Sequence, residues 1–92
     1  MIKSFRHKGL QAFFVKGTKA GIRAHHANKL RLQLFALSRA AKPEDLAAPG
    51  WRRHALSGNL AGHWSISVNG NWRLIFRFVG SDVELVNYLD YN

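Results

Sequence analysis

Residues 63–79, HWSISVNGNWRLIFRFV, alternate apolar and polar side chains on both sides of a central asparagine and glycine turn. This alternation predicts two strands of a β-hairpin, because successive side chains of a strand point to opposite faces of the sheet. Arg73 and Arg77 interrupt the apolar second strand, and charged side chains are rarely buried without partners. The register of the hairpin therefore decides which face the two arginines occupy.

A three-residue loop, 69–71, pairs Val68 with Trp72 and separates the apolar side chains from the polar ones. We expect the last loop residue, Asn71, to take the left-handed conformation that asparagine tolerates. Because a slip of one residue would invert every side chain, the apolar face selects this register. Both arginines should then lie on the open face of the sheet, away from the helices. The apolar face would hold Trp64, Ile66, Val68, Trp72, Leu74, Phe76 and Phe78, and the open face His63, Ser65, Ser67, Arg73, Ile75 and Arg77.

The rest of the chain predicts an α+β fold in which the helices cover one face of a largely antiparallel sheet. The expected order is a strand, two helices and four strands, all within one domain that spans residues 1–92. Pro43 should end or redirect the second helix, and residues 42–50 read as a connector with one helical turn. The expected strands are 2–6, 51–56, 63–68, 72–79 and 83–89; the helices are marked by Leu10, Phe13 and Phe14, and by Ala27, Leu30, Leu34, Leu37 and Ala41.

The second helix carries an additional apolar strip, formed by Leu32 and Phe35, almost opposite its main apolar face. A strip in this position has two explanations. It packs against the first helix as part of the core, or it is a contact surface for a partner.

The chain is strongly basic, with 14 lysines and arginines against 5 acidic residues and a formal net charge of +9. Its first 43 residues contain ten basic side chains and no acidic one. Such a field concentrates polyanions, so nucleic acid is the leading partner class, although basic side chains can also serve only solubility. The chain lacks cysteines and a continuous apolar leader, which favours a cytoplasmic protein without a membrane partner.

Motifs for metals and nucleotide cofactors are missing, so we expect neither a metal nor a cofactor. A strand arginine such as Arg73 offers a planar fork of donors to phosphate oxygens. The alternative for Arg73 is an ion pair with an acidic residue of the next strand: Asp82, Glu84 or Asp90.

His54 is the first candidate for proton transfer, because imidazole titrates near neutral pH and basic residues precede this histidine. The other histidines, His7, His25, His26 and His63, lack such a context, and a structural role is the alternative for His54 as well. At the end of the chain, Asp90 could orient or accept a proton and Tyr91 could stack on a base. A frayed terminus is the alternative there. Residues that we expect to contact substrate are Arg52, Arg53, Ser57, Arg77 and Asn92.

Five segments together resemble the HigB-type toxins of bacterial toxin-antitoxin modules, within the RelE-like superfamily. They are MIKSFRHKGL (1–10), HALSG (54–58), GHWSISV (62–68), NWRLIF (71–76) and DYN (90–92). The resemblance implies a metal-independent endoribonuclease that cleaves mRNA in the ribosomal A site. It also implies restraint by a HigA-type helix-turn-helix antitoxin, which binds operator DNA together with the toxin. By position it makes His54, Arg73, Asp90 and Tyr91 the catalytic residues.

Two residues depart from the pattern of these toxins. Ser57 stands where many of them have a lysine, and Asn92 stands where they have a terminal histidine. An inactivated homologue, or a module that binds RNA or the ribosome without cleaving, is therefore the alternative function. The hypothesis of a DNA-binding regulator has less support still, because no helix carries an evident set of base-reading residues.

Overall fold

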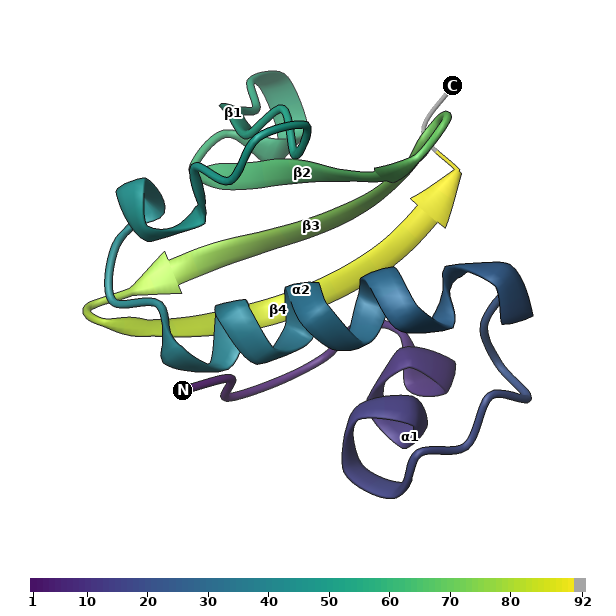
Figure 1. The fold of residues 1–92 in the computed structure, drawn as a ribbon. Coiled ribbons are helices and arrows are strands. Elements are labelled where there is room, and N and C mark those ends of the chain that lie inside the picture. The colour runs from purple at the N-terminus through teal and green to yellow at the C-terminus, as the bar shows by residue number, and fades with distance from the viewer. Residues whose placement is uncertain (91–92) are drawn as a thin grey trace.

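The computed structural model describes residues 1–90 as a curved antiparallel sheet with one helix across its face and another beside that helix (Figure 1). The four strands lie in the order β1-β2-β3-β4. Short 3-10 turns connect the helices and the first strands, including the single turn predicted after Pro43. The helices are α1, Lys8–Lys16, and α2, Ala27–Arg39; the strands are β1, His54–Ala55, β2, His63–Asn69, β3, Trp72–Val79, and β4, Asp82–Asp90; the turns are Ala24–His26, Pro43–Leu46 and Gly58–Leu60.

The predicted register of the central hairpin is confirmed. Ser67 lies opposite Arg73 and Trp64 lies opposite Phe76, as the apolar face requires. The turn itself differs, because a bulge between Ser67 and Asn69 shortens the loop. The prediction of a left-handed Asn71 was wrong: Gly70 takes that conformation, with φ 57°. Glycine has no Cβ to clash there, so it adopts positive φ at lower cost than asparagine.

The core lies between α2 and the apolar face of the hairpin. Leu30, Leu34 and Leu37, spaced three and four residues apart on α2, are fully or almost fully buried. They form one cluster with the buried side chains of the sheet, among them Leu74 and Phe76. Burial of each such side chain contributes roughly 1.5–3 kcal/mol, which makes this contact the main source of stability. The face of the sheet that packs against α2 is therefore the apolar face that the sequence predicted.

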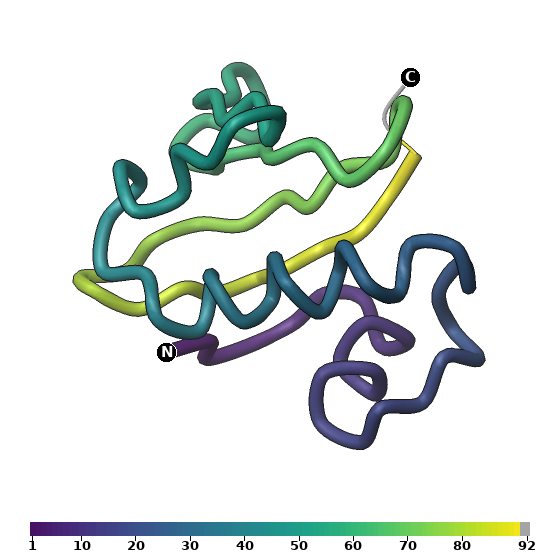
Figure 2. The backbone as a smooth tube through the Cα atoms, viewed as in Figure 1, coloured from purple at the N-terminus to yellow at the C-terminus, as the bar shows by residue number. Residues whose placement is uncertain are grey.

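The N-terminal segment does not form the regular strand predicted for residues 2–6. It runs parallel to β4 and makes two isolated bridges, Ile2 with Val83 and Phe5 with Val86 (Figure 2). Between these bridges β4 bulges, and Leu85 takes a left-handed conformation with φ 57°. The Leu85 amide donates a hydrogen bond to Ser4 Oγ at 3.0 Å. A bulge breaks the ladder locally, so continuous pairing along this edge is prevented.

The extra apolar strip of α2 is exposed rather than packed against α1. The exposed fractions of Leu32 and Phe35 are 57% and 59%, so the core explanation for this strip was wrong. α2 also ends at Arg39, earlier than the predicted Ala41. No helix within residues 1–90 has both the length and the apolar character needed to cross a bilayer.

Candidate functional site

Cross-strand pairing brings His54 and Arg73 to the same face of the sheet, the one turned away from α2. His54 lies opposite Ser65 on β2, and Arg73 lies opposite Ser67 two residues further along that strand. Directly paired residues point to the same side. With strands about 4.8 Å apart and a rise of about 3.3 Å per residue, the Cα atoms of His54 and Arg73 are roughly 12 Å apart. We call this surface the site face; besides these four residues it holds His63, Ile75 and Arg77.

The imidazole of His54 is exposed and held by a backbone carbonyl. Its Nδ1 lies 3.1 Å from the carbonyl oxygen of Arg52. A carbonyl oxygen can only accept, so this contact requires the proton on Nδ1 and leaves the lone pair on Nε2. Arg52 itself has φ 50°, a left-handed conformation that is costly for a residue with a Cβ. Backbone strain of this kind is often found at functional sites.

Arg73 is half-buried, and no carboxylate within residues 1–90 neutralises its charge. Its Nη1 donates to the Gly70 carbonyl oxygen at 3.3 Å. Its Nε is buried and has no hydrogen-bond partner in the part of the chain that the structure describes. The alternative of an ion pair with Asp82, Glu84 or Asp90 is therefore not observed among these residues. A guanidinium with unsatisfied donors is suited to an anion.

Asp90 is exposed at the end of β4. Its partner across the strands is Trp72, which belongs to the helix-facing side of the sheet. The alternation of side chains therefore separates Asp90 from Arg73. Tyr91 and Asn92, which were predicted beside them, lie outside the described residues.

Comparison with known proteins identifies the family of this chain and agrees with the fold. Residues 3–92 match the family described as HigB-like toxin, the RelE-like toxin HigB of type II toxin-antitoxin systems. The chain belongs to this family. It is 39% identical to Endoribonuclease HigB of Proteus vulgaris over 92 residues, which is the full length of both proteins. Toxin HigB-1 of Vibrio cholerae is 38% identical over 98% of this chain and 96% of that protein.

Solved structures of YafQ from E. coli share the fold of this HigB-like toxin. Two of them superpose with TM-scores of 0.63 and 0.65, at 20% and 16% sequence identity. Each comparison covers 96% of this chain and 89% of the other. The likeness confirms an α+β RelE-like fold with antiparallel strands.

The other predicted substrate contacts of the HigB-like chain lie apart from the site face or make other contacts. Arg77 forms an ion pair with Glu84 on β4, and its Nε donates to Glu84 Oε2 at 2.8 Å. Arg53 donates to the Pro43 carbonyl oxygen at 2.9 Å, and its guanidinium lies 5.5 Å from the Trp64 ring centre. Arg53 therefore lies on the helix-facing side with Trp64. Arg52 and Ser57 are near His54 in sequence, and Ser57 is exposed.

The middle of the site face is less open than the pattern predicted. Ser65 is fully buried, and His63 and Ile75 are 8% and 3% exposed. Within residues 1–90, neither ring nitrogen of His63 has a hydrogen-bond partner, and Ser65 Oγ has none. Half-buried Arg73 and exposed His54 thus lie at the margin of this face.

An aromatic cluster packs against the end of β4 on the side that faces the helices. The sequence did not predict this cluster. Tyr88 Oη lies 2.7 Å from Nδ1 of His26, and the Tyr88 ring packs against Trp72 at 4.7 Å between centroids. Burial lowers the pKa of His26, and the nearby charges of His25 and Arg23 lower it further. Burial also raises the pKa of Tyr88. Two adjacent histidines before a helix give no spacing signal, which explains why this cluster was missed.

Proposed function

We propose that this chain is an mRNA endoribonuclease that cleaves messages in the ribosomal A site and so inhibits translation. One observation carries the proposal. Within residues 1–90, His54 Nε2 has no hydrogen-bond partner, and His54 shares the outer face of the sheet with Arg73, which has no acidic partner there. A base and an uncompensated cation on the same face of a sheet suit transfer of a phosphoryl group. The named activity of the Proteus vulgaris relative supports the same reading.

In the proposed reaction, His54 Nε2 takes the proton of a ribose 2′-hydroxyl. The 2′-oxygen then attacks the adjacent phosphorus, and the bond from phosphorus to the 5′-oxygen breaks. The leaving oxygen gains a proton, which gives a 2′,3′-cyclic phosphate and a 5′-hydroxyl. Arg73 stabilises the charge that develops on the phosphoryl oxygens. The family pattern makes Asp90 the candidate for the second proton transfer, which requires its carboxylate to reach the site face around the end of β4. Tyr91 is the candidate for positioning the base.

The proposed partners follow from the same family. We place the chain in the cytoplasm, in a module with a HigA-type helix-turn-helix antitoxin. The toxin and antitoxin together would bind operator DNA. The strong positive charge of the first 43 residues supports contact with ribosomal and messenger RNA.

Primer extension after brief induction tests this function. Messages that are being translated should show new 5′ ends within their reading frames, and the same messages without a start codon should stay intact. The end chemistry should be a 5′-hydroxyl, detected by labelling with polynucleotide kinase without prior phosphatase treatment. Intact translated messages would contradict a nuclease and favour a binding module. If untranslated RNA is cleaved equally well, cleavage does not require the ribosome.

The backbone at Arg52 should affect catalysis separately from its side chain. Arg52→Asn and Arg52→Val both remove the guanidinium, but only asparagine tolerates the left-handed conformation. We expect Arg52→Val to cleave about fivefold more slowly than Arg52→Asn, because a penalty of roughly 1 kcal/mol turns the carbonyl away from His54. Nitrogen NMR of the imidazole should show the proton on Nδ1 in the asparagine variant and its loss in the valine variant. Identical spectra and rates would mean that the carbonyl does not set the tautomer.

A further inference from the structure

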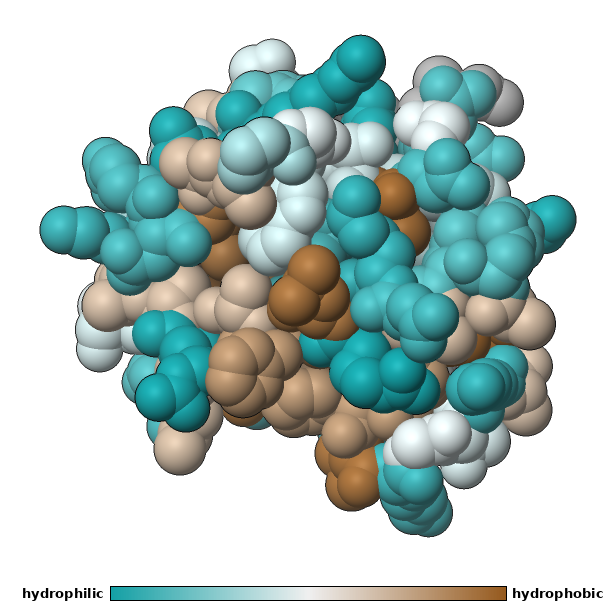
Figure 3. Space-filling view, in the orientation of Figure 1, coloured by the Kyte–Doolittle hydropathy of each residue, from teal (hydrophilic) through white to brown (hydrophobic). Residues whose placement is uncertain are grey.

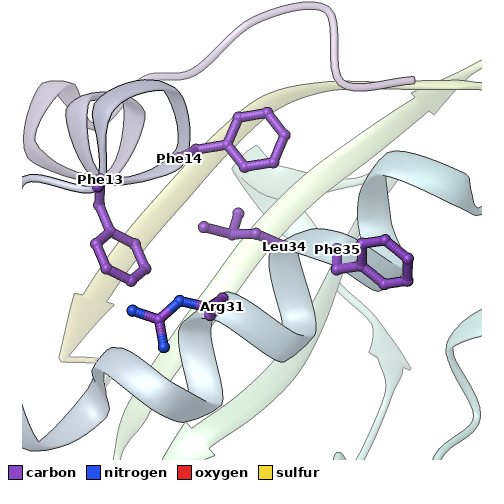
Figure 4. Close-up of a pocket in the computed structure, with 6 residues that line it drawn as sticks. Phe13, Phe14, Arg31, Leu34 and Phe35 are labelled. Atoms are coloured by element: carbon purple, nitrogen blue, oxygen red, sulfur yellow. The ribbon is translucent and has the colours of Figure 1, made fainter.

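The two helices form an apolar groove that nothing in the described chain covers. The hollow has a volume of 310 Å³ and lies between α1 and α2 (Figure 4). In the close-up, Phe13 and Phe14 reach from α1 toward α2, where Leu34 lies between them and Phe35. We call this surface the helix groove; its lining residues are Phe13, Phe14, Gly17, Arg31, Leu34 and Phe35.

Large apolar side chains are exposed mainly on the two helices, and two of them, Phe14 and Phe35, line the groove. Six such residues are exposed within residues 1–90, and four of them belong to α1 or α2. The face crossed by α2 shows hydrophobic side chains gathered between hydrophilic ones (Figure 3). Single exposed apolar residues are ordinary, but a contiguous patch with a polar rim marks an interaction site. The four residues are Phe14, Val15, Leu32 and Phe35.

The rim of the helix groove is cationic. The guanidinium of Arg31 lies 5.5 Å from the Phe13 ring centre, and that of Arg39 lies 5.4 Å from the Phe35 ring centre. Neither arginine is within ion-pair distance of a carboxylate among residues 1–90. None of the residues that line the groove is acidic. An occupant that fits must supply both apolar anchors and negative charge.

We propose that the helix groove is the surface on which the antitoxin docks, and that it takes an amphipathic helix with acidic flanks. Apolar anchors at i and i+3 or i+4 would enter the hollow between Phe14 and Phe35, as in other helix-in-groove contacts. Carboxylates beside the anchors would pair with Arg31 and Arg39. The inference rests on the proposed pairing with an antitoxin, but not on the nuclease residues. α2 packs on the opposite face of the sheet from His54 and Arg73, so the two surfaces are separate.

The test measures binding of the antitoxin encoded beside this chain, by calorimetry with the full chain and no RNA. Phe35→Glu places a carboxylate in the groove and should weaken binding by at least about thirtyfold, the loss typical of a central anchor. Val79→Glu is the matched control, because Val79 is 51% exposed on β3 and does not line the groove. The control should bind within about twofold of wild type, since a surface residue outside an interface contributes little. Thermal unfolding of both variants checks that the fold is intact.

Amide NMR of the complex provides a second measurement that does not depend on substitutions. Shifts on binding should concentrate in residues 10–17 and 31–39. Shifts confined to the site face, or equal binding by Phe35→Glu and Val79→Glu, would overturn the proposal. If a short single-stranded RNA displaces the antitoxin and shifts the same amides, the groove binds RNA instead. If the wild-type chain forms no complex with the antitoxin, both the proposed pairing and the proposed docking surface are wrong. The cleavage assay does not depend on this result.

Discussion

Arg73→Ala is expected to lower the rate of message cleavage by about a hundredfold to a thousandfold, the usual cost of removing one donor to a developing oxyanion. The reason lies in its surroundings. Nη1 holds only the Gly70 carbonyl oxygen, and the buried Nε has no partner within residues 1–90, so donors remain for a phosphate. Ground-state binding should change less than the rate, because charge on the phosphoryl oxygens increases in the transition state.

The measurement is single-turnover cleavage of a programmed ribosome complex with toxin in excess. Arg73→Lys should restore only part of the rate, since a point charge cannot match the planar fork. Arg6→Ala is the control for losing one positive charge, because Arg6 is exposed on the N-terminal segment and far from the site face in sequence. If Arg6→Ala slows cleavage as much as Arg73→Ala does, net charge rather than a specific contact explains the effect.

The position of Arg73 could be predicted from the sequence because alternation leaves only one register that keeps the apolar residues together. Trp64, Leu74 and Phe76 all lie on the side that this register requires. Period-two patterns determine which face a side chain occupies. They do not determine the partner, which lies elsewhere in the chain.

Arg77 illustrates this limit. Arg77 lies four residues after Arg73 on the same strand, so alternation of side chains predicts the same face for both. A bulge between the partners of Ile75 and Arg77 brings Glu84 opposite Arg77 and leaves Arg73 opposite Leu89. Bulges depend on local backbone strain, here the left-handed Leu85, which no periodicity reveals. Tertiary pairing therefore distinguishes an arginine with an acidic partner from one without.

The predicted cluster of catalytic residues is only partly assembled among the described residues. His54 and Arg73 share a face, whereas Asp90 lies across from Trp72 on the other side. The sequence could not separate them, since Asp90 is the last residue of its strand and no following pattern fixes its direction. Arg53, which was predicted as a substrate contact, lies on the opposite side from His54, because an extended chain turns neighbouring side chains to opposite sides.

His54→Ala is expected to lower the cleavage rate by about a hundredfold to ten-thousandfold, the usual contribution of a positioned general base. Its Nδ1 is committed to the Arg52 carbonyl oxygen at 3.1 Å, so Nε2 is the nitrogen available to the 2′-hydroxyl. Added imidazole should recover part of the lost rate by entering the space that the side chain leaves. A residue that only supports the fold would not be rescued in this way. The measurement is the same single-turnover assay, with and without imidazole.

The control for His54→Ala is His25→Ala, because His25 is an exposed histidine on the helix side, outside the site face. Its rate should match wild type and should not respond to imidazole. If His54→Ala retains most of the rate, another group accepts the proton. The base would then have to come from the end of β4 or from the ribosome, with Arg73 left as the one catalytic contribution of the site face.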